Sequence, residues 1–113
     1  MKKRPDITSV QDIVRAAKLA QTFLKGISQE SFSKDLKTQA AICRQLEIIG
    51  EATTRLSADF KKSVSAVPWR EMVGMRNILI HLYEDVDTDQ LWRTVDRDLP
   101  VLISALEPHS AKD

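Results

Sequence analysis

The sequence is poor in the residues on which disulfides and metal sites depend. It contains one cysteine, Cys43, and two histidines, His81 and His109, which are far apart in the chain. A single cysteine excludes an internal disulfide framework and is typical of a reducing cytoplasm. The absence of H-x-x-x-H and C-x-x-C spacings argues against a transition-metal site. We therefore expect a cytoplasmic protein that uses no cofactor of its own.

Glycine, aromatic residues and long apolar runs are also scarce. Three glycines and an aromatic content of 5% favour packed helices over a sheet with tight turns. No apolar run approaches the ~20 residues that span a bilayer, and the basic residues at 1–6 are not followed by the apolar segment of a signal peptide. We therefore expect no membrane association.

Two further absences limit the chemistry. The sequence has no glycine-rich phosphate loop and no G-x-S-x-G elbow, so any catalysis must use acid–base and electrostatic groups. The net charge is only +1, which gives no general attraction for nucleic acid. Binding of RNA would need a local basic groove.

Apolar residues recur with helical spacing along most of the chain. Thr8 or Ser9 can cap the first predicted helix and Gly26 can end it. Pro68 suits the first turn of the third helix, whereas Pro100 lies inside the last one and is expected to kink it. The predicted main helices cover residues 9–25, 35–56, 68 onward and 88–106. Residues 28–34 are expected to form a connector or a single turn, and residues 57–67 a short helix and a loop.

These elements predict an all-α fold, an antiparallel bundle of four to five helices. The whole chain, residues 1–113, is expected to be one domain, with frayed tails at 1–7 and 107–113. The sequence Asp87-Thr88-Asp89-Gln90 has the form of a helix cap just ahead of the last helix.

A group of polar residues interrupts an otherwise apolar stretch of the third helix. Arg76, Asn77, His81 and Tyr83 follow the spacing R-N-x-x-x-H-x-Y. Polar groups are costly among aliphatic residues unless they have a partner or a task, so the pattern indicates a site. A helix with two apolar faces usually packs on two partners. A second copy of the chain is a natural partner, and a homodimer would gather two Arg76 and two His81 at one seam.

Ordinary structural roles are the alternatives for these residues. His81 could be a histidine at the edge of the core, and Tyr83 an amphipathic aromatic at a helix end. Arg76 could form an ion pair with one of three acidic residues, Glu51, Glu71 or Glu84.

Other conspicuous side chains have stronger structural interpretations. Trp69 and Trp92 are predicted to be core anchors rather than platforms for nucleobases, and Cys43 an inert buried thiol. The basic residues Arg55, Lys61 and Lys62 are predicted to form solvated surface, with the guiding of RNA phosphates as the alternative.

The sequence resembles the HEPN superfamily, and within it the HepT-like toxins that are paired with a minimal nucleotidyltransferase antitoxin of the MntA type. The family motif, R-x4-H-x-Y with a polar residue after the arginine, corresponds here to Arg76, Asn77, His81 and Tyr83. The resemblance extends over residues 44–52, 67–69, 74–77 and 87–99, and spans most of the chain from about residue 10 to 106.

This resemblance implies a metal-independent endoribonuclease that cleaves RNA, either tRNA or mRNA, by attack of a ribose 2′-OH at a homodimer seam. Arg76, Asn77 and His81 would be catalytic. Tyr83 would be AMPylated by the nucleotidyltransferase antitoxin, with ATP as the AMP donor. Glu51 and Arg44 would form a buried supporting pair near the homodimer seam that positions Arg76. The alternative is a non-catalytic HEPN subunit that binds a nucleotide or the partner within a nucleotidyltransferase complex.

Overall fold

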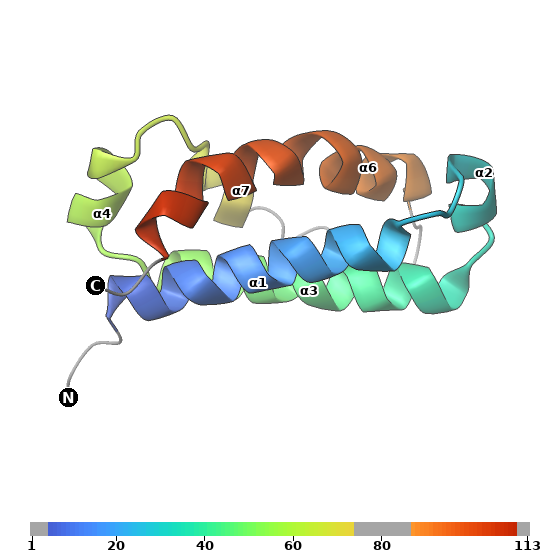
Figure 1. Ribbon diagram of the computed structural model, residues 1–113, viewed down its shortest axis with the longest axis horizontal. Coiled ribbons are helices and arrows are strands. Elements are labelled where there is room, and N and C mark those ends of the chain that lie inside the picture. Colours follow the sequence, from blue (N-terminus) through green and yellow to red (C-terminus); the bar gives the residue numbers. More distant parts are fainter. Residues whose placement is uncertain (1–4, 74–86, 111–113) are drawn as a thin grey trace.

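The computed structural model describes residues 5–73 and 87–110, and these form a bundle of helices (Figure 1). No residue within those two ranges belongs to a β-strand, which confirms the predicted all-α class. In Figure 1, helices α1 and α3 lie side by side, and the C-terminal helical stretch runs along them as a second layer.

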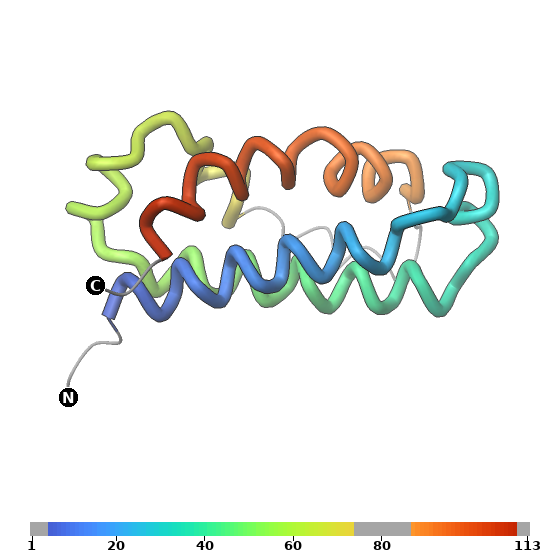
Figure 2. The backbone as a smooth tube through the Cα atoms, viewed as in Figure 1, coloured from blue at the N-terminus to red at the C-terminus, as the bar shows by residue number. Residues whose placement is uncertain are grey.

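Helices α1 (Asp6–Leu24) and α3 (Leu36–Thr54) run antiparallel and form the most extensive contact of the described chain (Figure 2). Small residues allow the two backbones to approach, since Ala16, Ala17 and Ala20 of α1 are all buried. Larger aliphatic side chains of both helices belong to the core and are fully buried: Val10, Ile13, Ile42, Leu46 and Ile49. Each such side chain contributes roughly 1.5–3 kcal/mol by leaving water.

Helix α1 begins three residues earlier than the sequence predicts. Pro5 precedes its first turn in an extended conformation (φ −59°, ψ 142°), and neither predicted cap is used. Asp6 instead accepts hydrogen bonds from Ser57 N (2.9 Å) and Ser57 Oγ (2.7 Å). The predicted frayed tail is therefore wrong for residues 6 and 7, because a distant partner holds the first turn. The predicted stop is confirmed: Gly26 follows the helix end with φ +79°, a conformation that glycine adopts without strain.

The short helix α2 (Gln29–Phe32) closes one end of the bundle, where a single turn was predicted. Ser28 caps it by accepting a hydrogen bond from Ser31 N at 3.1 Å. Phe32 is fully buried. Its carbonyl accepts a hydrogen bond from Gln39 Nε2 at 2.9 Å, which connects α2 to α3.

Asp35 caps the start of α3. Its two carboxylate oxygens accept hydrogen bonds from Thr38 N (3.0 Å) and Thr38 Oγ1 (2.6 Å). The hydroxyl bond, followed by the backbone bond, lowers the pKa of Asp35 below its usual 3.8. The charged carboxylate is thus the form that the helix start stabilises.

Helix α4 (Ala58–Ser63) closes the opposite end of the bundle, in the segment where a short helix was predicted. Ser57 caps it through a 3.1 Å bond from Phe60 N to Ser57 Oγ. The next helix is described over residues 69–73 and starts directly after Pro68, near the predicted place. The Pro68 carbonyl accepts a hydrogen bond from Met72 N at 3.1 Å, so the proline closes the first turn without needing an N–H of its own.

The predicted last helix is present as α6 (Thr88–Arg93), a π-helical turn η1 (Thr94–Asp98) and α7 (Leu99–Leu106). Pro100 has no N–H for the carbonyl four residues earlier, and its ring crowds that carbonyl. The expected distortion takes the form of the π turn, in which Leu99 N donates to Thr94 O. The chain therefore passes Pro100 and remains helical.

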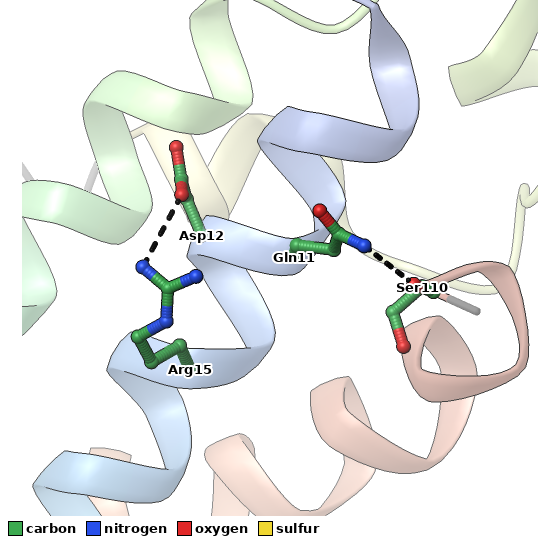
Figure 3. A network of polar contacts seen from close by, with 4 residues as sticks. All are labelled: Gln11, Asp12, Arg15 and Ser110. Carbon is green, nitrogen blue, oxygen red and sulfur yellow. Dashed lines mark hydrogen bonds and ion pairs between the residues drawn. The ribbon is translucent and has the colours of Figure 1, made fainter. Parts of the chain in front are cut away.

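The C-terminal segment is fastened to α1, although a frayed tail was predicted from residue 107. It forms a 3₁₀ turn, η2 (Glu107–His109). Figure 3 shows Gln11 Nε2 donating to the Ser110 carbonyl at 2.9 Å. Glu107 also forms an ion pair with Lys18 of α1. The prediction is thus wrong for residues 107–110, because contacts with α1 order them. No helix in the described part of the chain is long and apolar enough to cross a membrane.

Candidate functional site

The four residues of the R-x4-H-x-Y motif, Arg76, Asn77, His81 and Tyr83, lie outside the described residues. Their proposed geometry therefore stays a prediction. What the structure does describe is the segment that leads into the motif, the segment that follows it, and helix α3 with the proposed supporting residues.

Trp69 fixes the start of the segment that leads into the motif. Its indole Nε1–H is shared between the carbonyls of Lys61 (2.9 Å) and Val64 (3.1 Å). Its ring lies 6.2 Å from that of Phe60, edge to face. Because the side chain is half-buried against the core, these contacts agree with the predicted anchor role. The first turn of this helix is thereby held on α4.

The segment that follows the motif is fixed by a helix cap and an aromatic contact. Asp87 Oδ1 accepts a hydrogen bond from Gln90 N at 2.9 Å, which confirms the predicted cap. Trp92, one turn later, packs with its ring 6.0 Å from that of Phe32. Helix α6 is thus held against α2, and Trp92 also agrees with its predicted role as an anchor.

The pairing of Arg44 with Glu51 near the homodimer seam stays a prediction, because Arg76, which the pair would position, lies outside the described residues. Arg44 is exposed, and its Nη1 contacts Glu47 Oε1 at 3.0 Å. Residues three apart on a helix are neighbours, whereas residues seven apart are separated by about 10 Å along its axis. Glu47 is therefore the closer acidic partner. With the Arg44 side chain 61% exposed, the pair adds little to stability.

Cys43 is an inert thiol, as the sequence predicts. It lies on α3 and is buried, and burial raises the pKa of its thiol to about 11. At neutral pH the sulfur is therefore protonated and a poor nucleophile. Across residues 5–73 and 87–110, no group of three or more His, Cys, Asp or Glu side chains is placed to hold a metal ion.

One aromatic group is absent from the sequence-based predictions. His109 of η2 lies 5.5 Å from Phe60 of α4, with the two rings nearly perpendicular at 87°. Phe60 in turn contacts Trp69, so three aromatic rings from separate segments meet at this end of the bundle. No local pattern predicts this meeting, because His109 and Phe60 are far apart in the chain and the tail was expected to be frayed.

Comparison with known proteins places the chain in a family. The profile of the family described as "Ribonuclease HepT-like" matches residues 13–108. The chain belongs to the ribonuclease HepT-like family. This membership confirms the predicted HEPN-type assignment and the ribonuclease class of the enzyme.

Individual relatives of this HepT-like chain agree with the assignment. A Thermococcus cleftensis protein named "Probable ribonuclease HepT" is 45% identical over 93% of this chain and 96% of its own length. A Methanocaldococcus jannaschii protein named "Putative RNase" is 39% identical over 95% of this chain and 98% of its own length. Another protein named "Putative RNase", from Caldanaerobacter subterraneus subsp. tengcongensis, is 46% identical over 70% of each chain. No solved structure gives a significant match.

Proposed function

We propose that this HepT-like protein is the toxin of a toxin–antitoxin pair and acts in the cytoplasm as a metal-independent endoribonuclease. The observation that carries the proposal is the family match over residues 13–108, a range that includes an intact Arg76, Asn77, His81 and Tyr83. The RNase names of relatives that cover nearly the whole chain support the same activity. The substrate is RNA, either tRNA or mRNA.

In the proposed reaction a ribose 2′-OH attacks the adjacent phosphorus. His81 accepts the hydroxyl proton while the new O–P bond forms, and His81 of the second subunit protonates the 5′-oxygen as its bond to phosphorus breaks. An imidazole is suited to both roles near neutral pH. Arg76 binds the non-bridging oxygens, where negative charge grows, and Asn77 orients His81 or the phosphate. The products are a 2′,3′-cyclic phosphate and a 5′-OH.

This scheme requires a homodimer, because each reaction uses histidines from two subunits. The third helix has two apolar sides in its sequence, and a second copy of the chain would cover the side that carries Arg76 and His81. Sedimentation of the purified protein should give the mass of a dimer. A monomer that cleaves RNA with full activity would contradict the shared site.

Cleavage in EDTA and the variant His81→Ala test the chemistry. The wild-type protein should cleave RNA in excess EDTA and leave cyclic phosphate ends. His81→Ala should abolish both cleavage and growth arrest while keeping the helical circular dichroism spectrum. His109→Ala is the matched control for cleavage at saturating RNA, since it removes the other histidine and should keep kcat. Loss of cleavage in EDTA from a folded dimer would exclude the metal-free reaction.

We propose that Tyr83 is the regulatory residue. The partner, a nucleotidyltransferase antitoxin of the MntA type, would transfer AMP from ATP to the Tyr83 hydroxyl and release pyrophosphate. A nucleotide at this position would bring a phosphate next to Arg76, two helical turns away, and block RNA by charge and bulk. After co-expression, the intact mass should rise by whole AMP units, and Tyr83→Phe should prevent the increase. A Phe variant that is still modified and silenced would contradict the assignment.

The second candidate is a non-catalytic HEPN subunit that binds a nucleotide or assists the nucleotidyltransferase. The observation in its favour is the presence of both Arg76 and His81 in the sequence, because a cation and an imidazole also suit the binding of a nucleotide phosphate. Expression of the chain alone decides between the two. Growth arrest that is lost on mutation of His81 supports the nuclease, whereas the absence of arrest and cleavage supports the binding subunit.

A further inference from the structure

The segment around α4 carries more basic than acidic side chains. Residues 55–71 contain four basic side chains and two acidic ones, Asp59 and Glu71, so their net charge is +2 although the whole chain carries only +1. Residues 87–98 contain four aspartates and two arginines, which gives −2. The basic residues of the first segment are Arg55, Lys61, Lys62 and Arg70.

The same end carries aromatic rings that are not fully covered. Phe60 is partly exposed and His109 is exposed. Because the rings of Phe60 and His109 are perpendicular, the phenyl ring covers at most one face of the imidazole. At least one face of His109 is therefore free of Phe60. Residues close to His109 in the sequence are fastened to α1, since Glu107 is paired with Lys18 and the Ser110 carbonyl with Gln11.

The cations and the rings are brought together by the fold. Lys61 and Lys62 directly follow Phe60 within one short helix, and Arg70 directly follows Trp69. The ring contacts of Phe60 with Trp69 and with His109 bring together the segments that carry these cations. Lys62 and Arg70 are exposed, so their charges are available to a ligand.

We infer that this α4 end, defined by Phe60, Lys62, Arg70 and His109, is a second RNA-binding surface that holds single-stranded RNA in addition to the R-x4-H motif. Single-stranded nucleic acid is bound where cations contact the phosphates and aromatic faces stack on bases. The surface offers both. The inference rests on the proposed ribonuclease activity, and its role is to position the strand that flanks the cleaved bond.

The test compares two double variants with the same loss of charge. Lys62→Gln with Arg70→Gln removes two exposed cations from the α4 end. Lys34→Gln with Lys37→Gln removes two exposed lysines near α2, at the opposite end of the bundle (Figure 1). Binding of a fluorescent single-stranded RNA is measured by anisotropy over a series of salt concentrations. We expect the first variant to bind more weakly and to lose about 1.4 from its log–log salt slope, or about 0.7 for each phosphate contact. The second should match the wild type.

Substitution of His109 tests stacking separately from charge. His109→Ala should weaken RNA binding about fivefold or more, whereas His109→Phe keeps a ring and should restore most of the affinity. Thermal unfolding of each variant checks that the fold is intact. Equal losses of RNA affinity in the two double variants, or a His109→Ala variant that binds RNA like the wild type, would overturn the inference.

Cleavage of the same RNA, measured in parallel, separates this inference from the proposed function. The α4 variants should raise KM and leave kcat close to wild type. A wild-type protein that binds RNA at the α4 end but does not cleave it would contradict the nuclease and leave the surface supported. A protein that cleaves RNA with no change in the α4 variants would contradict the surface alone, and one that neither binds nor cleaves contradicts both.

Discussion

Each end of the bundle is closed by a short helix that begins at a serine cap and carries a phenylalanine packed against a tryptophan. At the α2 end, Ser28 is the cap and Phe32 meets Trp92 at 6.0 Å. At the α4 end, Ser57 is the cap and Phe60 meets Trp69 at 6.2 Å. The local chemistry is nearly the same at the two ends.

The difference lies in what covers the phenylalanine. Phe32 is fully buried between α2, α3 and α6, so its whole surface contributes to stability. Phe60 is partly exposed, and its ring contacts the exposed ring of His109. The exposed Lys62 lies in the same short helix as Phe60. The same arrangement of serine cap, phenylalanine and tryptophan therefore buries its phenylalanine at the α2 end. At the α4 end it leaves aromatic rings and charged side chains exposed to solvent.

The largest difference in stability between the two ends should appear when each phenylalanine is truncated to alanine. Phe32→Ala leaves a cavity in the core and should lower the free energy of unfolding by about 3–5 kcal/mol. Phe60→Ala removes a half-exposed ring and should cost roughly 1–2 kcal/mol. Urea unfolding followed by circular dichroism measures both. Equal losses would show that the two ends are energetically equivalent.

The second largest difference in the free energy of unfolding should come from the long-range polar contacts at the two ends. Asp6→Ala removes both acceptors from Ser57 and should cost about 1–3 kcal/mol, since hydrogen bonds to a charged group are stronger than neutral ones. At the other end, Gln29→Ala removes an exposed 3.0 Å bond to Asp89 and should change stability by no more than about 0.5 kcal/mol. Asp6→Asn, which keeps one acceptor, should lie between them. A larger loss from Gln29→Ala would reverse the ranking.

Lowering the pH should destabilise the α2 end of the bundle through protonation of Asp35. Its pKa is lower in the folded chain than the usual 3.8, chiefly because of the hydrogen bonds from Thr38. The stabilisation by the carboxylate is therefore complete above the unfolded pKa and is lost as the pH falls through the folded value. The difference in urea midpoint between wild type and Asp35→Ala should be largest near neutral pH and shrink as the pH falls below the usual 3.8. Asp35→Asn cannot titrate, so its difference from Asp35→Ala should stay constant with pH.

The smallest effect should come from the ion pair that joins α1 to the C-terminal turn. The side chains of Lys18 and Glu107 are 54% and 50% exposed, and solvent screens such a pair. Lys18→Ala should change the free energy of unfolding by no more than about 0.5 kcal/mol. A clear loss that disappears in 1 M salt (a Debye length of about 3 Å) would show that this pair, rather than the Gln11–Ser110 bond, orders the C-terminal segment.

Local signals predicted most of the helix boundaries correctly. Gly26 ends α1, and Asp87 caps α6 through a residue only three positions away. Such signals work because both partners lie within one turn, where backbone geometry fixes their distance. The π turn before Pro100 is predictable in the same way as a distortion, since the missing N–H of proline belongs to the sequence itself.

The errors occurred where a residue's partner is distant in the sequence. Helix α1 starts early because Asp6 bonds to Ser57. Residues 107–110 are ordered because Gln11 binds the Ser110 carbonyl. For the candidate site, the sequence identifies Arg76, Asn77, His81 and Tyr83, and their arrangement stays a prediction.

The sequence by itself determined the helical class, most helix ends, the inert thiol at Cys43 and the family to which the chain belongs. These depend on residue spacing and on interactions within a few positions, which any helix of this sequence would contain. Only the tertiary structure decided that His109, Phe60 and Trp69 meet at the α4 end, and that both ends of the described chain are held in place. The physical reason is that such contacts join segments distant in sequence, and they form only after the helices have packed and fixed where each end lies.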